Sequence, residues 1–287
     1  MKSKEKFIQN FEKKVRETIK KYGLASKKDK IVVACSGGKD STTVLYLLKK
    51  FGYDVSALFI NLLMGQWSKK NLENLKKFCK QYKIKLYVVD MRKEFGCSMC
   101  YLRSSIKSKT NISNCAICGV VRRWLLNKKA RQLGADKIAT GHNLDDEVET
   151  ILMNVLKGNL ELSLGFGPTV GVIEDKRFVP RIKPLYFCTN DEIKKYSKIM
   201  KFPVLYQPCP CLASFRKEIR ELIPSLEKID KKIKMNLVEN FLNVVLPIVR
   251  EKYKEEIKEM RYCKTCGEPS RNEICKRCSL IEVLHKD

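Results

Sequence analysis

Short apolar runs alternate along this chain with longer segments in which apolar residues recur every three or four positions. A short apolar run bounded by polar residues is typical of a buried strand, and the longer period is that of an amphipathic helix. The short runs predict strands at residues 31–35, 55–61, 86–90 and 137–140. The periodic segments predict helices at residues 42–50, 71–82, 119–133 and 145–157.

This alternation predicts an α/β fold with a doubly wound parallel sheet of the Rossmann-like type. Parallel strands need helical crossovers, and these cover both faces of the sheet. We expect an N-terminal helix in residues 1–28 and the sheet domain in 29–222. After about Pro224 the pattern is helical only, which predicts a helical extension in 223–257 and a small cysteine module in 258–287.

The most informative motif is the glycine loop, residues 36–41, which follows the first predicted strand with the sequence Ser-Gly-Gly-Lys-Asp-Ser. Backbone N–H groups at a helix N-terminus have no intrahelical partner, and glycines let a phosphate approach them. Lys39 would add a cation, and Asp40 would help to hold Mg²⁺ or orient Lys39. The loop is not a Walker A motif, and an ordinary glycine turn is the alternative. The order of strand, turn and helix favours phosphate binding.

The charge of the chain favours a polyanionic partner. Lysine and arginine number 58 against 32 aspartate and glutamate residues, a formal net charge of +26. A lysine-rich composition can also reflect genome composition or adaptation to high temperature. The distribution of charge along the chain is therefore more informative than the total. No acidic residue lies between Phe95 and Ala135, although several lysines and arginines do. Such a segment favours RNA or DNA as a partner over a merely solvated surface.

The chain shows neither a membrane span nor a secretion signal. No stretch of about 20 apolar residues is present, so no transmembrane helix and no membrane partner are expected. The N-terminal segment is charged and lacks an apolar signal core, which predicts a cytoplasmic protein. Its 13 cysteines would then favour metal binding or catalysis over disulfides.

Four of the cysteines form two CxxC pairs near the C-terminus and predict a zinc site. Two such pairs can enclose one tetrahedral Zn²⁺, and a short segment with few apolar residues would hardly fold without it. An iron–sulfur cluster is the alternative occupant. The predicted ligands are Cys263, Cys266, Cys275 and Cys278.

A second cysteine group belongs to the sheet domain. Cys115 and Cys118 open a predicted helix and precede Arg122 and Arg123. Thiols at a helix N-terminus near arginines are expected to have a lowered pKa, which suits metal ligation or sulfur chemistry. Three cysteines brought together can hold a [4Fe-4S] cluster and leave its fourth iron open.

Two alternatives remain open for this group. Cys97 and Cys100 have the spacing of a further pair and would complete a second zinc site with the two cysteines that open the helix. The third cluster ligand would come from Cys209 or Cys211, since both lie within one short turn.

A third motif, residues 140–147, follows the last predicted strand with the sequence Thr-Gly-His-Asn-Leu-Asp-Asp-Glu. Gly141 would give a nucleotide access to the strand end. Asp145 and Asp146 can hold Mg²⁺ or act as acid and base, but adjacent acids at a helix start are also ordinary capping residues. His142 alone is more often a core histidine than a catalyst.

Together these motifs resemble those of the N-type ATP pyrophosphatases, or PP-loop enzymes. More closely they resemble the tRNA-uridine 2-sulfurtransferases that carry a C-terminal zinc ribbon. The resemblance includes CxxCGxxRR from Cys115 and Arg-Ile-Lys-Pro-Leu from Arg181, and it runs from about Lys30 to Cys278. It implies that ATP adenylates the C2 oxygen of a tRNA uridine. Sulfur carried on a three-cysteine [4Fe-4S] cluster then replaces AMP.

The resemblance also implies which residues bind ATP. The glycine loop and Lys183 would contact the phosphates, and the main chain near Ala57 and Gly141 would face the adenine and ribose. The ATP-binding residues implied in this way are Ser36, Gly37, Gly38, Lys39, Asp40, Ser41, Ala57, Gly141 and Lys183.

Cluster ligands and catalytic residues are implied in the same way. Cys115 and Cys118 would be the paired cluster ligands, and Cys209 is the best match to the third. Asp146 matches the catalytic acid of the family. Lys39 and Arg122 are the other two catalytic residues that the resemblance implies. Arg122 occupies a place that can be lysine, and an arginine there keeps the role of stabilising charge on pyrophosphate or the adenylate.

The implied cofactors are ATP, Mg²⁺, a [4Fe-4S] cluster and Zn²⁺, and the implied partners are tRNA and a sulfur donor. The donor would be sulfide, a persulfide or a thiocarboxylated ubiquitin-like carrier. A homodimer is expected, with residues 238–249 either at its interface or in the core. The target uridine, in the wobble position or the T-loop, is not decided by the sequence.

Two other functions remain as hypotheses. A sulfur-free adenylating enzyme similar to lysidine synthetase would share the glycine loop, but it does not need the internal cysteines. A redox-responsive RNA-binding protein with an iron–sulfur or zinc site would keep only a remnant of the loop. Intact Lys39, Asp40 and Ser41 argue against such decay.

Overall fold

The computed structural model describes residues 2–170, 175–207, 209–210, 214–253 and 261–284. Its centre is a six-stranded sheet in the order β3-β2-β1-β4-β6-β5, in which only β5 runs antiparallel to its neighbour. The predicted doubly wound sheet is therefore confirmed. The strands are β1 (Lys30–Cys35), β2 (Asp54–Asn61), β3 (Lys85–Asp90), β4 (Lys137–Ala139), β5 (Thr169–Val170) and β6 (Arg181–Ile182).

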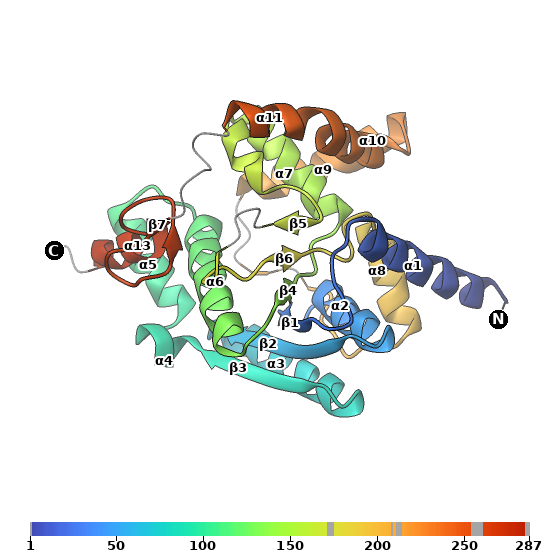
Figure 1. Cartoon of the computed structure of the whole chain (residues 1–287), viewed down its shortest axis with the longest axis horizontal. Helices are drawn as coiled ribbons and strands as arrows, with labels where there is room; N and C mark the ends of the chain where they lie inside the picture. The colour runs from blue at the N-terminus through green and yellow to red at the C-terminus, as the bar shows by residue number, and fades with distance from the viewer. Residues whose placement is uncertain (1, 171–174, 208, 211–213, 254–260, 285–287) are drawn as a thin grey trace.

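Helices cover both faces of the sheet (Figure 1). In β1, Ile31 and Val33 are buried in one core cluster, whereas Val32 is buried in the other, because successive strand residues point to opposite faces. The first face is covered by α1 (Lys2–Lys21), α2 (Lys39–Lys50), α3 (Gly65–Gln81) and α8 (Asn190–Ile199). The second is covered by α5 (Met99–Lys109), α6 (Asn114–Gln132) and α13 (Lys276–Leu284).

A third core cluster joins the helices that rise above the sheet in Figure 1. Pro224 lies inside one of them, α9, so the expected start of the helical extension at residue 223 falls within a helix. Proline disfavours a helix interior, but the buried Ile219 and Ile223 hold this helix against its neighbours. These helices are α7 (Leu144–Leu156), η1 (Leu160–Gly165), α9 (Ser214–Ile229), α10 (Ile233–Asn240), η2 (Phe241–Val245) and α11 (Leu246–Lys252).

The cysteine module ends the described chain. It contains the antiparallel pair β7 (Arg261–Tyr262) and β8 (Pro269–Ser270), followed by α13. Together with their connecting loops, these three elements form the ribbon. Leu280 of α13 is buried in the second core cluster together with residues of α5 and α6. The short helix α4 (Met91–Phe95) precedes α5.

The strand order places the glycine loop at the centre of the sheet. Chain connections run from β1 outward to β3 on one side, and β4 lies on the other side of β1. Ligands of doubly wound folds bind where this reversal opens a crevice at the carboxyl ends of the strands. The loops that follow β1 and β4 therefore meet there. None of the described helices is long and apolar enough to cross a bilayer.

Candidate active site

The glycine loop has the backbone that a phosphate site needs. Gly37 adopts a φ of +82°, and a Cβ there would lie 2.7 Å from Cβ of Asn71, so only glycine fits. Helix α2 starts at Lys39 after Gly38, which provides no side-chain cap. The N–H groups of the first turn therefore point into the crevice, where an anion can accept from them.

The loop after β4 packs directly against the glycine loop. A Cβ on Gly141 would lie 2.7 Å from the backbone nitrogen of Ser41. Asn143 Nδ2 donates to Asp40 Oδ1 over 3.2 Å, and the Asn143 side chain also caps α7 by accepting from the Asp146 N–H. A glycine at 141 is thus needed for close backbone approach, and Asn143 fixes α7 to the glycine loop.

Asp40 and Asn190 orient Lys39. Its ammonium donates to Asp40 Oδ1 over 2.7 Å and to Asn190 Oδ1. The Asn190 N–H in turn donates to Asp145 Oδ2 over 2.7 Å, which connects α8 to α7. Of the two roles expected for Asp40, the orientation of Lys39 is the one seen directly.

Asp146 has the pKa of an acid–base group at neutral pH. Burial raises its pKa from 3.8 to about 7, and the charges of Glu149 and Asp40 add to the effect. Arg216 and the backbone N–H of Asn143 oppose it. Because this carboxyl can both hold and release a proton near pH 7, it suits proton transfer.

His142 stays neutral in this crevice. Burial lowers its pKa to about 3, with further lowering by the cations of Lys183 and Arg122. Its Nδ1 lies 2.9 Å from Thr140 Oγ1. A neutral imidazole can accept a hydrogen bond from a ligand but carries no charge to it.

Lys183, expected as a phosphate contact, is held in a buried ion pair. Its Nζ lies 2.6 Å from Glu147 Oε1, and both side chains are nearly inaccessible. Burial raises the pKa of Glu147, and the adjacent Lys183 opposes that rise. Ala57 is fully buried in the middle of β2, whereas the three residues that follow it, 58–60, line a cavity.

That cavity, which we name the thiol cavity, has a volume of about 80 Å³. It brings Ser36 of the glycine loop together with Cys118, Cys209 and Arg122. The charges of Cys115 and Cys209 both act on Cys118, so three cysteines from distant parts of the sequence lie near one another. Cys118 and Cys209 in this lining, with Cys115 near Cys118, fit the ligands expected for a cluster bound by three cysteines.

The pKa expected for these thiols was wrong in one case. Burial raises the pKa of Cys118, and this effect exceeds the lowering by Arg122 and Arg103. Helix α6 does begin at this motif, with Ser113 as its N-cap, but its start is earlier than the predicted residue 119. A partly buried thiol of this kind ionises more readily once it binds a metal ion, because the metal charge replaces the lost solvation.

Neither metal group expected in the sheet domain is preassembled. Among the described residues, the ligand atoms of Cys97 and Cys100 with Cys115 and Cys118, and those of Cys115, Cys118 and Cys209, do not come together as closely as those of the terminal cysteines. Cys100 Sγ instead accepts from Arg103 over 3.5 Å. Cys211 lies outside the described residues.

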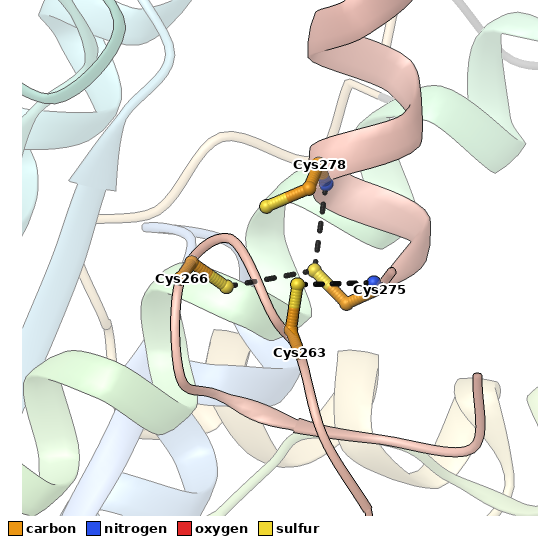
Figure 2. Close-up of side chains that lie close together, drawn as sticks. All are labelled: Cys263, Cys266, Cys275 and Cys278. Carbon is orange, nitrogen blue, oxygen red and sulfur yellow. Dashed lines mark hydrogen bonds between the residues drawn. The ribbon is translucent and has the colours of Figure 1, made fainter. Parts of the chain in front are cut away.

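The terminal cysteines converge as expected for one tetrahedral ion. Figure 2 shows the four thiols facing one another, and all four sulfur atoms lie within 4.8 Å of one another. The Cys275 N–H donates to Cys263 Sγ over 3.2 Å. Although burial opposes it, such backbone donors lower the pKa of Cys263 to about 6. This thiolate-stabilising geometry fits Zn²⁺ held by Cys263, Cys266, Cys275 and Cys278.

Sequence reasoning missed the asparagines that assemble the site. Asn71 packs against Gly37, and Asn190 accepts from Lys39 although 151 residues separate them. A capping box from Thr189 to Glu192 is visible in the sequence and would have placed Asn190 at a helix start. Nothing in the sequence places that helix beside the glycine loop.

Known proteins resemble this chain over nearly its whole length. The PP-loop domain family matches residues 7–225. The tRNA-5-methyluridine(54) 2-sulfurtransferase of Pyrococcus horikoshii is 36% identical over 278 residues, which cover 96% of this chain and 85% of the relative. The cytoplasmic tRNA 2-thiolation protein 1 of Chlamydomonas reinhardtii is 33% identical over 291 residues, which cover 99% of this chain and 79% of the relative. The solved U34-tRNA thiolase NcsA from Methanococcus maripaludis, with its [4Fe-4S] cluster, matches with a TM-score of 0.77 and 27% identity, covering 97% of this chain and 88% of that one.

Proposed function

This chain belongs to the PP-loop family and, within it, to the tRNA 2-thiolation enzymes; on that premise we propose that it replaces the C2 oxygen of a tRNA uridine with sulfur. ATP is converted to AMP and pyrophosphate in the reaction. The observation that supports this most directly is the thiol cavity, where Ser36 lies beside Cys118 and Cys209. A nucleotide held by the glycine loop has thiols within its own site, as activation followed by sulfur transfer requires.

Activation of the uridine would use the glycine loop and the start of α7. The first-turn N–H groups of α2 and the ammonium of Lys39 would hold the phosphates of ATP and its Mg²⁺. The C2 oxygen attacks the α-phosphorus, and pyrophosphate leaves. Asp146, whose pKa is raised to about 7, accepts the proton that N3 of the base must lose in this step. The exposed guanidinium of Arg122 would balance the charge of the leaving pyrophosphate.

Sulfur transfer would use Cys118 and Cys209 of the thiol cavity together with the nearby Cys115. A [4Fe-4S] cluster held by Cys115, Cys118 and Cys209 would offer one iron without a protein ligand, at which donor sulfur can bind. With hydrosulfide as the donor, the C2–S bond forms and the C2–O bond breaks, so AMP leaves with the original oxygen. The proton of hydrosulfide replaces the one that N3 lost.

The test is anaerobic reconstitution with iron and sulfide, followed by mass spectrometry of nucleosides from tRNA incubated with ATP, Mg²⁺ and sulfide. We expect 2-thiouridine, formed only by protein that carries about four irons per chain. Release of AMP and pyrophosphate without a thiolated base would instead favour a sulfur-free adenylating enzyme.

Two variants separate the two half-reactions. Lys39→Ala should abolish adenylation and leave the iron content unchanged, because Lys39 lies at the phosphate end of the site. Cys118→Ala should lose iron and thiolation but keep its affinity for tRNA. Full thiolation by Cys118→Ala would contradict the role of the cluster.

We also propose a homodimer and a sulfur donor that is sulfide, a persulfide or a thiocarboxylated ubiquitin-like carrier. Val238, Phe241 and Leu246 are buried in the third core cluster, whereas Val244 and Ile248 on the same helical segment are largely exposed. The exposed pair supports an interface between two copies, and Ile248→Lys should then yield monomers in sedimentation experiments.

Thiolation with sulfide alone would show that a carrier protein is not obligatory.

A further inference from the structure

A second cavity, of about 340 Å³, lies between helix α6 and the ribbon, and we name it the ribbon cavity. Arg123 and Arg181 line it from the sheet domain, and Arg271, Lys276 and Arg277 line it from the ribbon. The proposed reaction uses none of these five side chains.

The ribbon cavity is strongly positive, because the one carboxylate among its described lining residues already has a partner; Arg277 also donates to Cys278 Sγ over 3.6 Å. None of these five cations forms an ion pair with a carboxylate among the described residues. The one acid in the lining, Glu268, is already paired with Arg131 and accepts from Asn127 Nδ2 over 3.2 Å. Burial lowers the pKa of Arg181 to about 10, and the charge of Arg123 adds to that lowering. Such a cluster repels itself until an anion is bound.

Donors in the ribbon cavity also lack partners. Seven buried side-chain atoms among the described residues have no hydrogen-bond partner, and three of them belong to this lining. They are Nε1 of Trp124 and Nε of Arg181 and Arg277. Since unpaired buried donors are costly, their concentration around one cavity shows that the packing of this lining supplies too few acceptors.

The two cavities are adjacent along α6. Arg122 lines the thiol cavity, and the next residue, Arg123, lines the ribbon cavity. The Arg123 guanidinium folds back over Gly119, where a Cβ would lie only 3.0 Å from its Nη1. An anion bound by Arg123 is therefore close to the helical turn that carries Cys118.

We propose that the ribbon cavity binds a backbone phosphate of the tRNA whose uridine enters the thiol cavity. This inference rests on the proposed function. Arginine suits the task because its planar guanidinium donates two parallel hydrogen bonds to a phosphate. Because the arginines come from both the sheet domain and the ribbon, the phosphate holds the RNA in register with the catalytic cysteines and bridges the two parts of the protein.

The test measures binding of an unmodified tRNA transcript to the full chain between about 50 and 200 mM salt. Arg123→Gln and Arg271→Gln each remove one cation, from opposite sides of the cavity. We expect each to lower affinity on the order of ten-fold and to reduce the salt slope by about one. The matched control is Arg92→Gln on α4, an exposed arginine outside both linings.

Four further measurements make the result decisive. Zinc content and melting temperature should stay at wild-type values in Arg123→Gln, which excludes misfolding. Its ATP affinity should also be unchanged, and a loss of ATP affinity with normal tRNA binding would overturn the inference by assigning the cavity to free nucleotide. The inference would also be overturned if inorganic phosphate displaced the bound tRNA transcript as strongly as unlabelled tRNA does.

The outcomes separate the two proposals. If wild-type protein thiolates tRNA but the cavity variants bind it normally, or no worse than Arg92→Gln, the ribbon cavity is not an RNA site and an acidic protein becomes its better occupant. If wild-type protein neither binds nor thiolates tRNA, the proposed function fails, and this inference fails with it.

Discussion

Asp146 shows how one residue acquires chemistry from its surroundings. Its side chain caps the helix it begins, accepting from the Asn143 N–H in the reciprocal capping box. The same position buries it near Glu149 and Asp40, and these three influences together raise its pKa to about 7. Capping and catalysis, which the sequence left as alternatives, are therefore compatible here. Ionisation of this buried carboxyl lowers the stability of the folded chain, so the stability depends on pH.

The pH dependence has a defined sign. The pKa of Asp146 in the folded chain, about 7, is above its ordinary value of 3.8. Stability from its protonated form is complete below about pH 4 and is lost as pH rises through 7. Asp146→Asn should therefore equal wild type at pH 4 and be more stable at pH 8, on the order of 2 kcal/mol. Urea unfolding at both pH values measures this.

The thiolation rate of the wild-type protein should rise with pH, whereas its stability falls. The adjacent Asp145 provides the control. Asp146→Asn should lower the thiolation rate at least about 100-fold, and the wild-type rate should rise with pH through about 7. Asp145→Asn should instead destabilise the protein at pH 8, because Asp145 accepts from Lys234 Nζ and from the Asn190 N–H. A gain in stability for both variants would contradict the assignment.

At the scale of elements, α7 and α9 are held together by charge as well as by apolar packing. Glu149 on α7 is almost fully buried and pairs with Arg216 and Arg220 on α9. A buried carboxylate with two arginines costs much to leave unpaired.

Glu149→Ala should destabilise the protein by about 3 kcal/mol or more, because two arginines lose their partner in a buried site. Glu221→Ala on α9 is the matched control, since Glu221 forms only an exposed pair with Lys217. Its effect should stay within about 0.5 kcal/mol. Equal effects in chemical unfolding would show that the buried contact carries no special weight.

At the scale of the whole molecule, the ribbon is part of the core. Leu280 is buried with residues of α5 and α6, and Arg277 lies over the rings of Phe95 and Trp124, 5.0 and 4.5 Å from their centroids. The lining of the thiol cavity, in contrast, includes no residue of the ribbon among those described. Loss of zinc should therefore affect stability and RNA binding before it affects the nucleotide site.

Cys266→Ser should lower zinc content, melting temperature and tRNA affinity while leaving ATP affinity near wild type. Removal of zinc from the wild-type protein by a chelator should have the same effects, because structural zinc contributes directly to folding. Titration calorimetry with ATP and a tRNA binding assay distinguish the two sites. A parallel loss of ATP affinity would mean that the ribbon supports the catalytic fold itself.

Sequence patterns predicted the parts of this architecture that depend on local periodicity. The four predicted strands and the helices between them lie near their predicted positions, although α3 begins at Gly65 rather than at residue 71. Strands β5 and β6 were missed because two-residue strands have no period. The ribbon cavity was also missed, because tertiary packing alone brings Arg123 and Arg271 together.

The place of α13 in the core has a consequence for how the protein is made. Its residues, 276–284, are translated after the rest of the described chain, yet Leu280 closes the second core cluster. Nascent chains fold from their N-terminal parts onward, so this face of the sheet stays open on the ribosome until the last cysteines emerge and take up their ion. Metal supply would thus act as a checkpoint in biogenesis, and a growth medium poor in zinc should leave newly synthesised chains exposed to proteases at α5 and α6.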